Sequence, residues 1–158
     1  MSLKTFKSYT KSTRGTVLVD RKNLWKGKSL KSLTIGRHST GGRNNLGRIT
    51  SRHKGAGHKH KYRQIDFYRK KDDIKAKIER IEYDPNRSAN VALIKYEDGV
   101  MNYIIAPNKI KIGDEIVSGK NKDIKIGNCM PLSDIPAGTE IHNVEITANS
   151  GDKLARSA

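Results

Sequence analysis

The sequence predicts a mainly β protein in which a small barrel follows a long, irregular and basic N-terminal extension. Two observations lead to this fold class. From Tyr62 onward, short apolar runs with a period of two residues alternate with glycine turns at intervals of about 8 to 12 residues, as in small barrels. Before about Lys61, apolar residues show little periodicity, and almost no part of the chain carries a helical pattern.

The basic charge lies almost entirely in the first part of the chain. The formal net charge is +16 and the isoelectric point is about 10.0. Residues 1–71 carry 20 lysines and arginines against two acids, whereas residues 72–158 carry 12 against 14. A polyanionic partner, either nucleic acid or an anionic membrane surface, fits this charge better than a small neutral substrate. We therefore expect the two parts to have different roles.

The extension, residues 1–60, holds only short apolar islands such as VLVD at residues 17–20 and Leu24-Trp25. Such a segment buries too little apolar surface to offset the entropy of ordering its backbone. We expect it to be largely disordered alone and to be ordered by a polyanion. The single cysteine, Cys129, allows neither an internal disulfide nor a cysteine-based zinc finger, and we expect it to be buried.

The first strand signals lie between residues 62 and 83. In YRQIDFYR, Ile65 and Phe67 share one face of the predicted strand. In IKAKIERIEY, Ile78 and Ile81 have opposite parity, although both are apolar positions. A β-bulge near Arg80 would return them to one face, so the sequence predicts a bulge there.

The following stretch predicts a hairpin and further short strands. Asp98-Gly99 lies between the alternating runs NVALIKY and VMNYIIA, which is a strong hairpin signal. Glycines at 113, 119 and 127 divide the next segment into short strands. PLSDIPAGT predicts a turn with one helical turn, and IHNVEI at residues 141–146 predicts another strand.

Residues 41–63, GGRNNLGRITSRHKGAGHKHKYR, hold five glycines and no acid. A phosphate-binding loop of an enzyme would need these glycines at a strand-to-helix turn, and that context is missing. Catalysis has no other support, because the acidic pairs at 72–73 and 97–98 fall at turns. No nucleophile, base and orienting group can be assembled, so we expect no catalytic residue and no cofactor.

A histidine metal site is the second reading of this stretch. His53, His58 and His60 lie close together, and imidazole is a common metal ligand. However, no cysteine or acid lies between Asp20 and Asp66, and the neighbouring lysines would repel a divalent cation. We therefore expect no bound metal.

Contact with a nucleic-acid backbone explains the stretch best. Glycine lets main-chain N–H groups approach phosphates and allows positive φ. The arginines offer planar donor forks to phosphates and base edges. His58, His60 and Tyr62 can stack on unpaired bases, which RNA loops supply more readily than duplex DNA. A merely solubilising basic tail is the simpler alternative, and the interleaved glycines argue against it.

Five stretches carry a resemblance to a known family: STGGRNNLGRITSRHKGAGHKHKYRQIDF, IERIEYDPNRSANVALIKYEDG, YIIAP, GNCMPLSDIPAGTEIHNVEI and LARSA. They are similar to the second protein of the large ribosomal subunit in its bacterial and organellar form. The likeness runs from about residue 12 to the last residue, and EYDPNRS at residues 82–88 is its most specific part. In that loop, Pro85 favours a turn, Asn86 tolerates a left-handed conformation and Arg87 is presented at the tip. A plain hairpin connection would explain all of these residues except the arginine.

The resemblance implies a primary binder of large-subunit ribosomal RNA that also contacts other large-subunit ribosomal proteins. It implies an RNA-binding arm at residues 1–60, an OB-like barrel at 61–125 and the first part of an SH3-like barrel at 126–158. The expected RNA-binding residues are Arg37, Arg43, Asn44, Asn45, Arg48, Thr50, Arg52, His53, Lys54, His58, Lys59, His60, Lys61, Tyr62, Arg63, Arg69, Lys70, Lys71, Arg80, Asn86, Arg87 and Ser88.

Members of the family continue beyond LARSA. We therefore expect a separate chain to carry the C-terminal half of the family sequence and to complete the second barrel. We also expect a mitochondrial ribosome, with the bacterial cytoplasm or a plastid as alternatives, because lysine outnumbers arginine 21 to 11 and Asn and Ile are frequent.

Two other functions compete with a ribosomal one. A free-standing OB-type single-stranded RNA-binding protein or translation factor would bind short RNA without a ribosome. A cationic protein of the membrane surface would need an amphipathic basic helix with an aromatic face, and the extension has no such period. We therefore expect no membrane partner.

Overall fold

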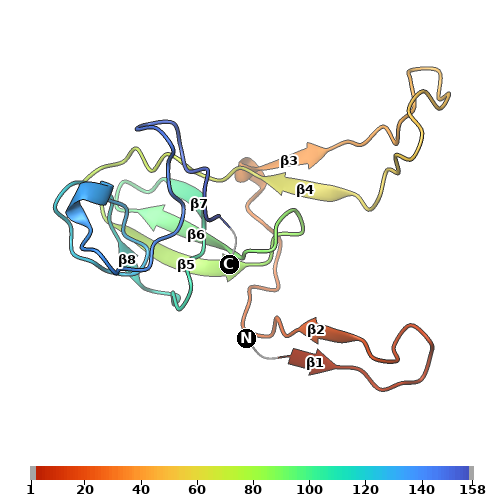
Figure 1. The fold of residues 1–158 in the computed structure, drawn as a ribbon, viewed down its shortest axis with the longest axis horizontal. Helices are drawn as coiled ribbons and strands as arrows, with labels where there is room; N and C mark the ends of the chain where they lie inside the picture. Colours follow the sequence, from red (N-terminus) through yellow and green to blue (C-terminus); the bar gives the residue numbers. More distant parts are fainter. Residues whose placement is uncertain (1–2, 157–158) are drawn as a thin grey trace.

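A computed structural model describes residues 3–156 and confirms a predominantly β protein (Figure 1). Residues 1, 2, 157 and 158, at the outer ends of two predicted domains and of the LARSA match, lie outside the described residues. The elements are β1 (Leu3–Thr5), β2 (Val17–Val19), η1 (Lys31–Leu33), β3 (Thr34–Arg37), β4 (His60–Arg63), β5 (Ala76–Glu82), β6 (Val91–Tyr96), β7 (Met101–Ile105), β8 (Glu115–Ile116) and η2 (Leu132–Asp134).

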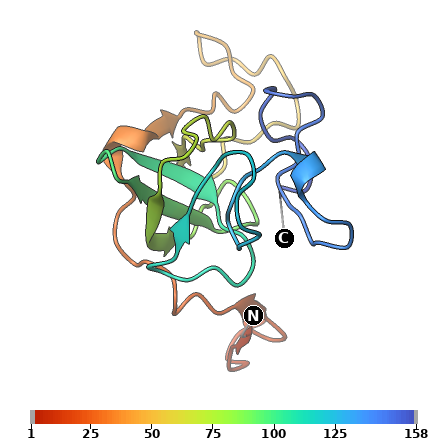
Figure 2. The same ribbon diagram turned by 90° about the vertical axis from the view of Figure 1, so that its left-hand side faces the viewer.

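A four-stranded antiparallel sheet in the order β7-β6-β5-β8 forms the centre of the molecule. It curls into half a barrel, as an OB-like barrel requires (Figure 2). The register of β5 against β6 shifts between Ile78 and Arg80, which confirms the predicted bulge. The hairpin between β6 and β7 is also confirmed: Gly99 has φ +83° and donates its N–H to the Tyr96 carbonyl at 2.9 Å.

Both faces of this sheet are covered, although the alternating sequence predicts strands with one buried face. On one face, Ile78, Ile94 and Ile116 belong to the main core. The residues of opposite parity on β6, Val91 and Leu93, are also buried. Leu30, Leu33 and Ile65 pack against that second face together with Tyr103 and Met101. The segments before and after the β3–β4 hairpin therefore contribute to the core of the barrel.

The N-terminal extension contains two antiparallel hairpins that the sequence pattern does not reveal. β1 pairs with β2, and β3 pairs with β4. Figure 1 shows both hairpins projecting from the sheet, with the loop between β3 and β4 reaching farthest. The predicted domain boundary at residue 60/61 falls inside β4, so the hairpin joins the arm to the barrel without a linker.

The C-terminal segment is mostly irregular. The expected helical turn in PLSDIPAGT is confirmed as η2 (Leu132–Asp134). The strand expected at residues 141–146 is wrong: within the described residues only Val144 forms a bridge, and its partner is Leu154. Further along, Asp152 N donates to Phe67 O at 3.0 Å and so attaches the segment to the barrel. Between residues 3 and 156, the chain has no helix of the length and apolarity that a membrane span needs.

Candidate nucleic-acid interface

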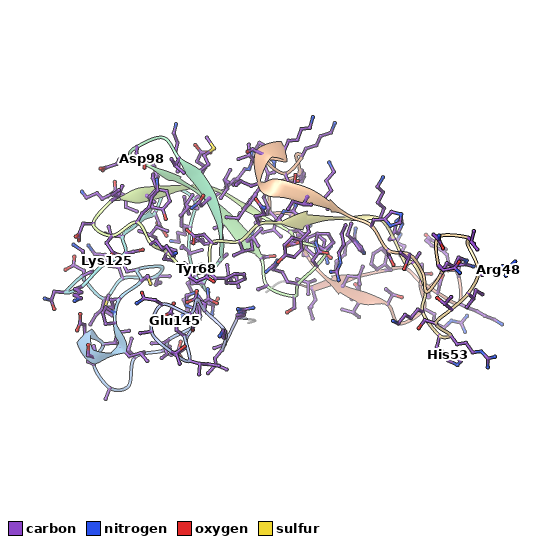
Figure 3. All side chains as sticks on the ribbon, turned by 90° about the horizontal axis from the view of Figure 1, so that it is seen from above. Arg48, His53, Tyr68, Asp98, Lys125 and Glu145 are labelled. Atoms are coloured by element: carbon purple, nitrogen blue, oxygen red, sulfur yellow. The ribbon has the colours of Figure 1, made fainter. Side chains whose placement is uncertain are left out.

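The β3–β4 hairpin carries the most basic loop of the protein away from the barrel. Its last pair is Arg37 with His60, so residues 38–59 form the loop beyond it. In Figure 3, Arg48 and His53 lie at one end of the molecule and Lys125 lies near the other. A large surface can therefore contact the arm without being blocked by the barrel.

Two consecutive glycines make the tight turn at the start of this loop. Gly42 has φ +72°, and its carbonyl accepts hydrogen bonds from the N–H groups of Thr50 at 2.9 Å and Ser51 at 3.1 Å. A Cβ at Gly42 would lie 2.3 Å from the Ser51 carbonyl oxygen. No other residue fits there, because the left-handed conformation and the close backbone approach both require glycine. The turn holds Arg43 opposite Ile49 in a bridge.

Asn44 stabilises the loop from within. Its side-chain Oδ1 accepts hydrogen bonds from the backbone N–H groups of Leu46 and Arg48, both at 3.0 Å. The Oδ1 atom of Asn44 is therefore occupied within the loop, and the RNA contact expected for Asn44 falls to its side-chain amino group. Asn45 is exposed beside it. Thr50 also contributes, since its hydroxyl donates to the Gly42 carbonyl at 3.3 Å.

Most of the predicted RNA-binding residues are exposed on this arm. Because no acid lies between Asp20 and Asp66, the exposed cations face no internal counter-charge along the loop. This arrangement creates a strong positive potential on a thin projection. The exposed predicted residues are Arg37, Arg43, Asn44, Asn45, Arg48, Thr50, Arg52, His53, Lys54, His58, Lys59, His60, Lys61, Tyr62, Lys70 and Ser88.

Arg63, in contrast, is buried at the base of the arm. Its Nε and Nη2 donate to Glu82 Oε2, both at 3.2 Å, and its Nη1 donates to Asp84 Oδ1 at 3.4 Å. Glu82 and Asp84 are 2% and 0% exposed. The guanidinium group is therefore used to fix β4 to β5, and it is not available for the RNA contact that the sequence suggested.

Glu82 joins further groups at the same place. Its Oε1 accepts hydrogen bonds from Arg80 Nε and from the Tyr103 hydroxyl, both at 2.8 Å. The Tyr103 oxygen in turn accepts from Leu30 N at 2.9 Å. This set, which we call the junction network, links the extension to strands β4, β5 and β7. Buried charges of this kind are tolerated only when they are paired and hydrogen-bonded.

The loop EYDPNRS supplies the rest of the junction network. Asp84 accepts hydrogen bonds from Asn86 N and Nδ2, both at 3.0 Å, and from Arg87 Nε at 2.6 Å. Asn86 Nδ2 also donates to Lys61 O at 2.8 Å. Burial would raise the pKa of Asp84, but the bonds from Asn86 and Arg87 outweigh it and lower the pKa below its ordinary value. Arg87 is thus folded back onto Asp84 rather than extended at the tip, and Asn86 does not use a left-handed conformation.

Two more predicted residues have internal partners. Arg69 is 8% exposed, and its Nε donates to Ser118 Oγ at 3.2 Å. Lys71 forms an ion pair with Asp98, and its Nζ lies 4.9 Å from the centre of the Tyr96 ring. These side chains hold the barrel together, because each joins segments that are far apart in sequence.

Three arginines lie over aromatic rings beside the junction network. The guanidinium carbon of Arg21 is 3.5 Å from the centre of the Tyr83 ring. Arg80 lies 4.8 Å from the Trp25 ring, and Arg87 lies 5.8 Å from the Tyr62 ring. The sequence prediction missed Arg21, Trp25 and Tyr83. An isolated tryptophan in a basic, polar segment was the only signal that could have indicated them.

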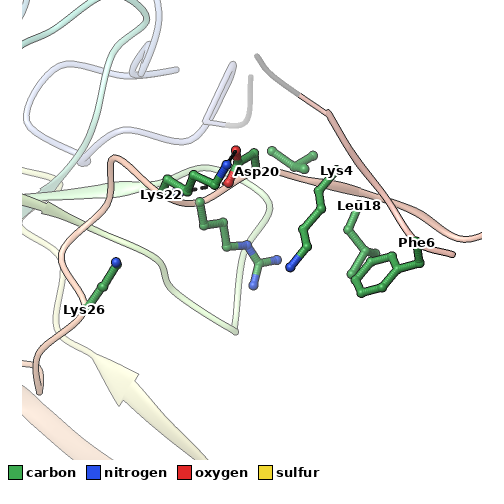
Figure 4. Close-up of a pocket in the computed structure, with 8 residues that line it drawn as sticks. Lys4, Phe6, Leu18, Asp20, Lys22 and Lys26 are labelled. Carbon is green, nitrogen blue, oxygen red and sulfur yellow. Dashed lines mark hydrogen bonds and ion pairs between the residues drawn. The ribbon is translucent and has the colours of Figure 1, made fainter.

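The β1–β2 hairpin borders a surface hollow of mixed character. Figure 4 shows its lining: the apolar side chains of Phe6 and Leu18 lie together beside Lys4, and Lys22 and Lys26 line the other side. The one acid there, Asp20, is paired with Lys22 at 3.4 Å. The hollow therefore continues the positive surface of the extension.

The part of the chain that the structure describes contains no group of three His, Cys, Asp or Glu residues placed to hold a metal ion.

Comparisons with known proteins agree with this geometry. Residues 30–118 match the family described as Ribosomal Proteins L2, RNA binding N-terminal domain. The whole chain is 61% identical to the large ribosomal subunit protein uL2 of Granulibacter bethesdensis, and 60% identical to that of Rickettsia typhi. It spans 57% and 58% of the length of these two relatives, respectively. The chain therefore belongs to the ribosomal protein L2 family, and the matched region is the RNA-binding N-terminal domain of that family.

Proposed function

We propose that this protein is a structural constituent of the large ribosomal subunit, with no catalytic role, that binds large-subunit ribosomal RNA and supports assembly and translation. The observation that carries the proposal is the β3–β4 arm, in which a glycine-shaped loop presents arginines, lysines and histidines without any acid. The division into an arm at 1–60, an OB-like barrel at 61–125 and a second unit from 126 belongs to the same proposal. Its relatives are ribosomal proteins of the large subunit.

The mechanism of binding follows from the two classes of cation in the structure. Exposed cations on the arm neutralise phosphates and release condensed counterions, which supplies affinity. Exposed backbone N–H groups in the glycine-rich loop add direct phosphate contacts. The buried Arg63 contributes indirectly, because the junction network holds the arm at a fixed place on the barrel. The barrel thereby presents the arm in one orientation.

The test is a titration of large-subunit ribosomal RNA with the chain at several salt concentrations. Contacts to six to ten phosphates would give a slope of log affinity against log salt of roughly −4 to −9. Replacing Arg43, Arg48 and Arg52 together by alanine should weaken binding by up to about 3 kcal/mol, at no more than roughly 1 kcal/mol for each solvent-exposed ion pair. The same variant should make the slope less negative by roughly 2–3.

The matched control replaces three exposed lysines of the barrel, Lys111, Lys120 and Lys125, by alanine. This variant has the same net charge as the arginine variant. If both variants lose equal affinity, binding is a nonspecific effect of charge and the arm has no special role. A nearly flat salt dependence would count against phosphate-led binding altogether.

We further propose that the part of the family sequence that follows residue 158 in the relatives covers the apolar side chains of the C-terminal segment. Ile141, Ile146 and Leu154 are each at least 45% exposed, and Val144 and Leu154 form a pair that a further strand can extend. Exposed apolar side chains next to unpaired backbone favour such an addition. Co-expression with the C-terminal part of a relative should give a stable complex. Separate elution of the two chains would contradict this proposal.

The ribosome concerned is, in this proposal, a mitochondrial one. The excess of lysine over arginine, 21 to 11, and the frequent Ile and Asn support it, since these residues are typical of AT-rich coding sequences. Sedimentation of ribosomes from isolated mitochondria tests this location. The competing function, a free-standing single-stranded RNA-binding protein or translation factor, predicts that the chain leaves the large particle during a high-salt wash.

A further inference from the structure

A second surface of the protein carries the chemistry to bind RNA, and it lies where Trp25 of the extension meets strand β5 of the barrel, away from the β3–β4 hairpin. It is a hollow lined by Trp25, Lys77, Ile78, Glu79, Arg80, Ile112 and Gly113. Trp25 lies outside the region that the family match covers, residues 30–118. The hollow therefore calls for its own explanation.

The bulge in β5 creates this hollow. On one side of the bulge, Ile78 exchanges hydrogen bonds with the next segment: Gly113 N donates to Ile78 O at 2.9 Å, and Ile78 N donates to Asp114 O at 3.0 Å. On the other side, Trp25 N donates to Ile81 O at 2.8 Å. The edge of β5 is thus bordered by two different segments, and the hollow lies between them. Glu79 and Arg80, where the register shifts, are among the residues that line it.

The indole ring of Trp25 is held in place but remains accessible. Gly27 lies against it so closely that a Cβ there would be 2.5 Å from the indole Nε1. Arg80 lies 4.8 Å from the ring centre, and its Nε is anchored to Glu82. Even so, Trp25 is 49% exposed. A rigid, half-exposed aromatic ring loses little entropy when a flat group stacks on it.

The charges around the ring indicate what that flat group is. Lys77 and Arg80 line the hollow together with Trp25. Arg21 lies over the ring of Tyr83, the residue that directly follows β5. A nucleobase stacks on indole, and its phosphates pair with nearby cations, so this combination is the usual one for single-stranded nucleic acid. Glu79 adds a carboxylate that can accept a hydrogen bond from an exocyclic amino group of a base.

We propose that this hollow binds one unpaired nucleotide of RNA, with the base stacked on Trp25 and the phosphate paired with Lys77 and with the Arg80 N–H groups other than the Nε–H that donates to Glu82. The inference rests on the proposed function, because it assumes that RNA is the partner of the protein. In this proposal the protein has two RNA-binding sites. The hollow is selective for single strands, and the arm recognises phosphates. Bases within a duplex are stacked on one another and cannot enter the hollow.

The chain offers a direct probe, because Trp25 is its single tryptophan. The intact chain is titrated with a short single-stranded oligoadenylate and, separately, with a blunt RNA duplex of equal length. Binding is followed both by filter retention and by tryptophan emission. We expect the single strand to quench the emission in parallel with its retention, and the duplex to be retained without quenching.

Variants separate this site from the arm. Trp25→Ala should weaken the binding of oligoadenylate roughly tenfold, as expected for the loss of one stacked base, and should leave duplex binding unchanged. Trp25→Phe keeps an aromatic ring and should restore most of the affinity. The control is Tyr9→Ala, which removes an aromatic residue that is 81% exposed far from the hollow in sequence.

Unchanged emission while oligoadenylate is fully retained on the filter would overturn the inference and leave the proposed function standing. Equal losses for Trp25→Ala and Tyr9→Ala would have the same meaning. If neither RNA is retained at all, the proposed function itself is wrong, and this inference fails with it.

Discussion

The central sheet buries its apolar side chains, whereas the β3–β4 arm exposes most of its own. In β6, Val91, Ala92, Leu93 and Ile94 are all at most 1% exposed. In β3, Ile35 is 52% exposed, and the loop beyond it is polar and cationic. The sheet is therefore stabilised by its own burial of apolar surface, while the arm depends on local turns and on its attachment to the barrel.

This comparison shows how one short chain can present a charged probe in a fixed position. Apolar burial cannot hold a thin hairpin, because a two-stranded hairpin has no interior. The molecule uses the junction network at the base instead, with Arg63 donating to Glu82 and Asp84. The predictions below test this division of roles, starting with the largest expected effect.

Replacing Glu82 by alanine should give the largest loss of stability, about 3–5 kcal/mol. The change leaves Arg63 and Arg80 without their shared carboxylate and removes the acceptor of the Tyr103 hydroxyl. Urea unfolding of the intact chain measures the effect. The matched control is Glu115→Ala, which removes an exposed glutamate from the edge strand β8. Similar midpoints for the two variants would show that the junction network contributes little to stability.

A pair of isoleucine variants compares the sheet with the arm directly. Ile94→Ala should cost about 2–5 kcal/mol, because it opens a cavity in the main core. Ile35→Ala should cost less than about 1 kcal/mol, since Ile35 is half exposed in a two-stranded hairpin. Both values come from the same urea titration. An arm variant as costly as the core variant would mean that the hairpin packs far more tightly than its exposure suggests.

The smallest effect concerns Asp152, where the C-terminal segment meets the barrel. Burial, reinforced by the nearby Glu145 carboxylate, raises the pKa of Asp152 to about 6 from 3.8. Between these two pH values the folded chain keeps a proton that the unfolded chain releases. The free energy of unfolding therefore falls as the pH rises through this window, and the penalty persists at neutral pH.

Asp152→Asn should remove this penalty and stabilise the protein by about 3 kcal/mol at pH 7, with little change near pH 4. Thermal unfolding of both proteins from pH 4 to 7 measures the difference. Parallel curves for the variant and the parent would show that the Asp152 carboxyl titrates normally. Asp152 lies against the barrel and not against the arm. The arm variants described above should therefore not alter the pH dependence that Asp152 causes.

The periodic parts of the sequence correctly predicted the bulge and the hairpin of the central sheet, but they were wrong on the short strands expected between residues 113 and 127, where only β8 (Glu115–Ile116) forms. The bulge near Arg80 followed from a change of parity, and the hairpin at Asp98-Gly99 followed from turn chemistry. The prediction of a strand at residues 141–146 was wrong, because an alternating sequence forms a strand only where a neighbouring strand is available to pair with it. The sequence pattern also did not predict the two hairpins of the extension. Their strands are only three or four residues long, too short to show a period, and they are held by pairing with each other.

The sequence alone was enough to indicate the kind of partner that we propose for this protein. The charge of its first 71 residues and the glycine spacing in residues 41–63 indicate RNA, since charge and backbone freedom are properties of composition. Tertiary structure decided which cations are free to reach that partner. Arg43 and Arg63 are equivalent in sequence, yet Arg43 is exposed and Arg63 is buried against two carboxylates that lie 19 and 21 residues away. Only the folded chain brings such groups together, because a buried arginine needs paired acids and the sequence does not show where they meet.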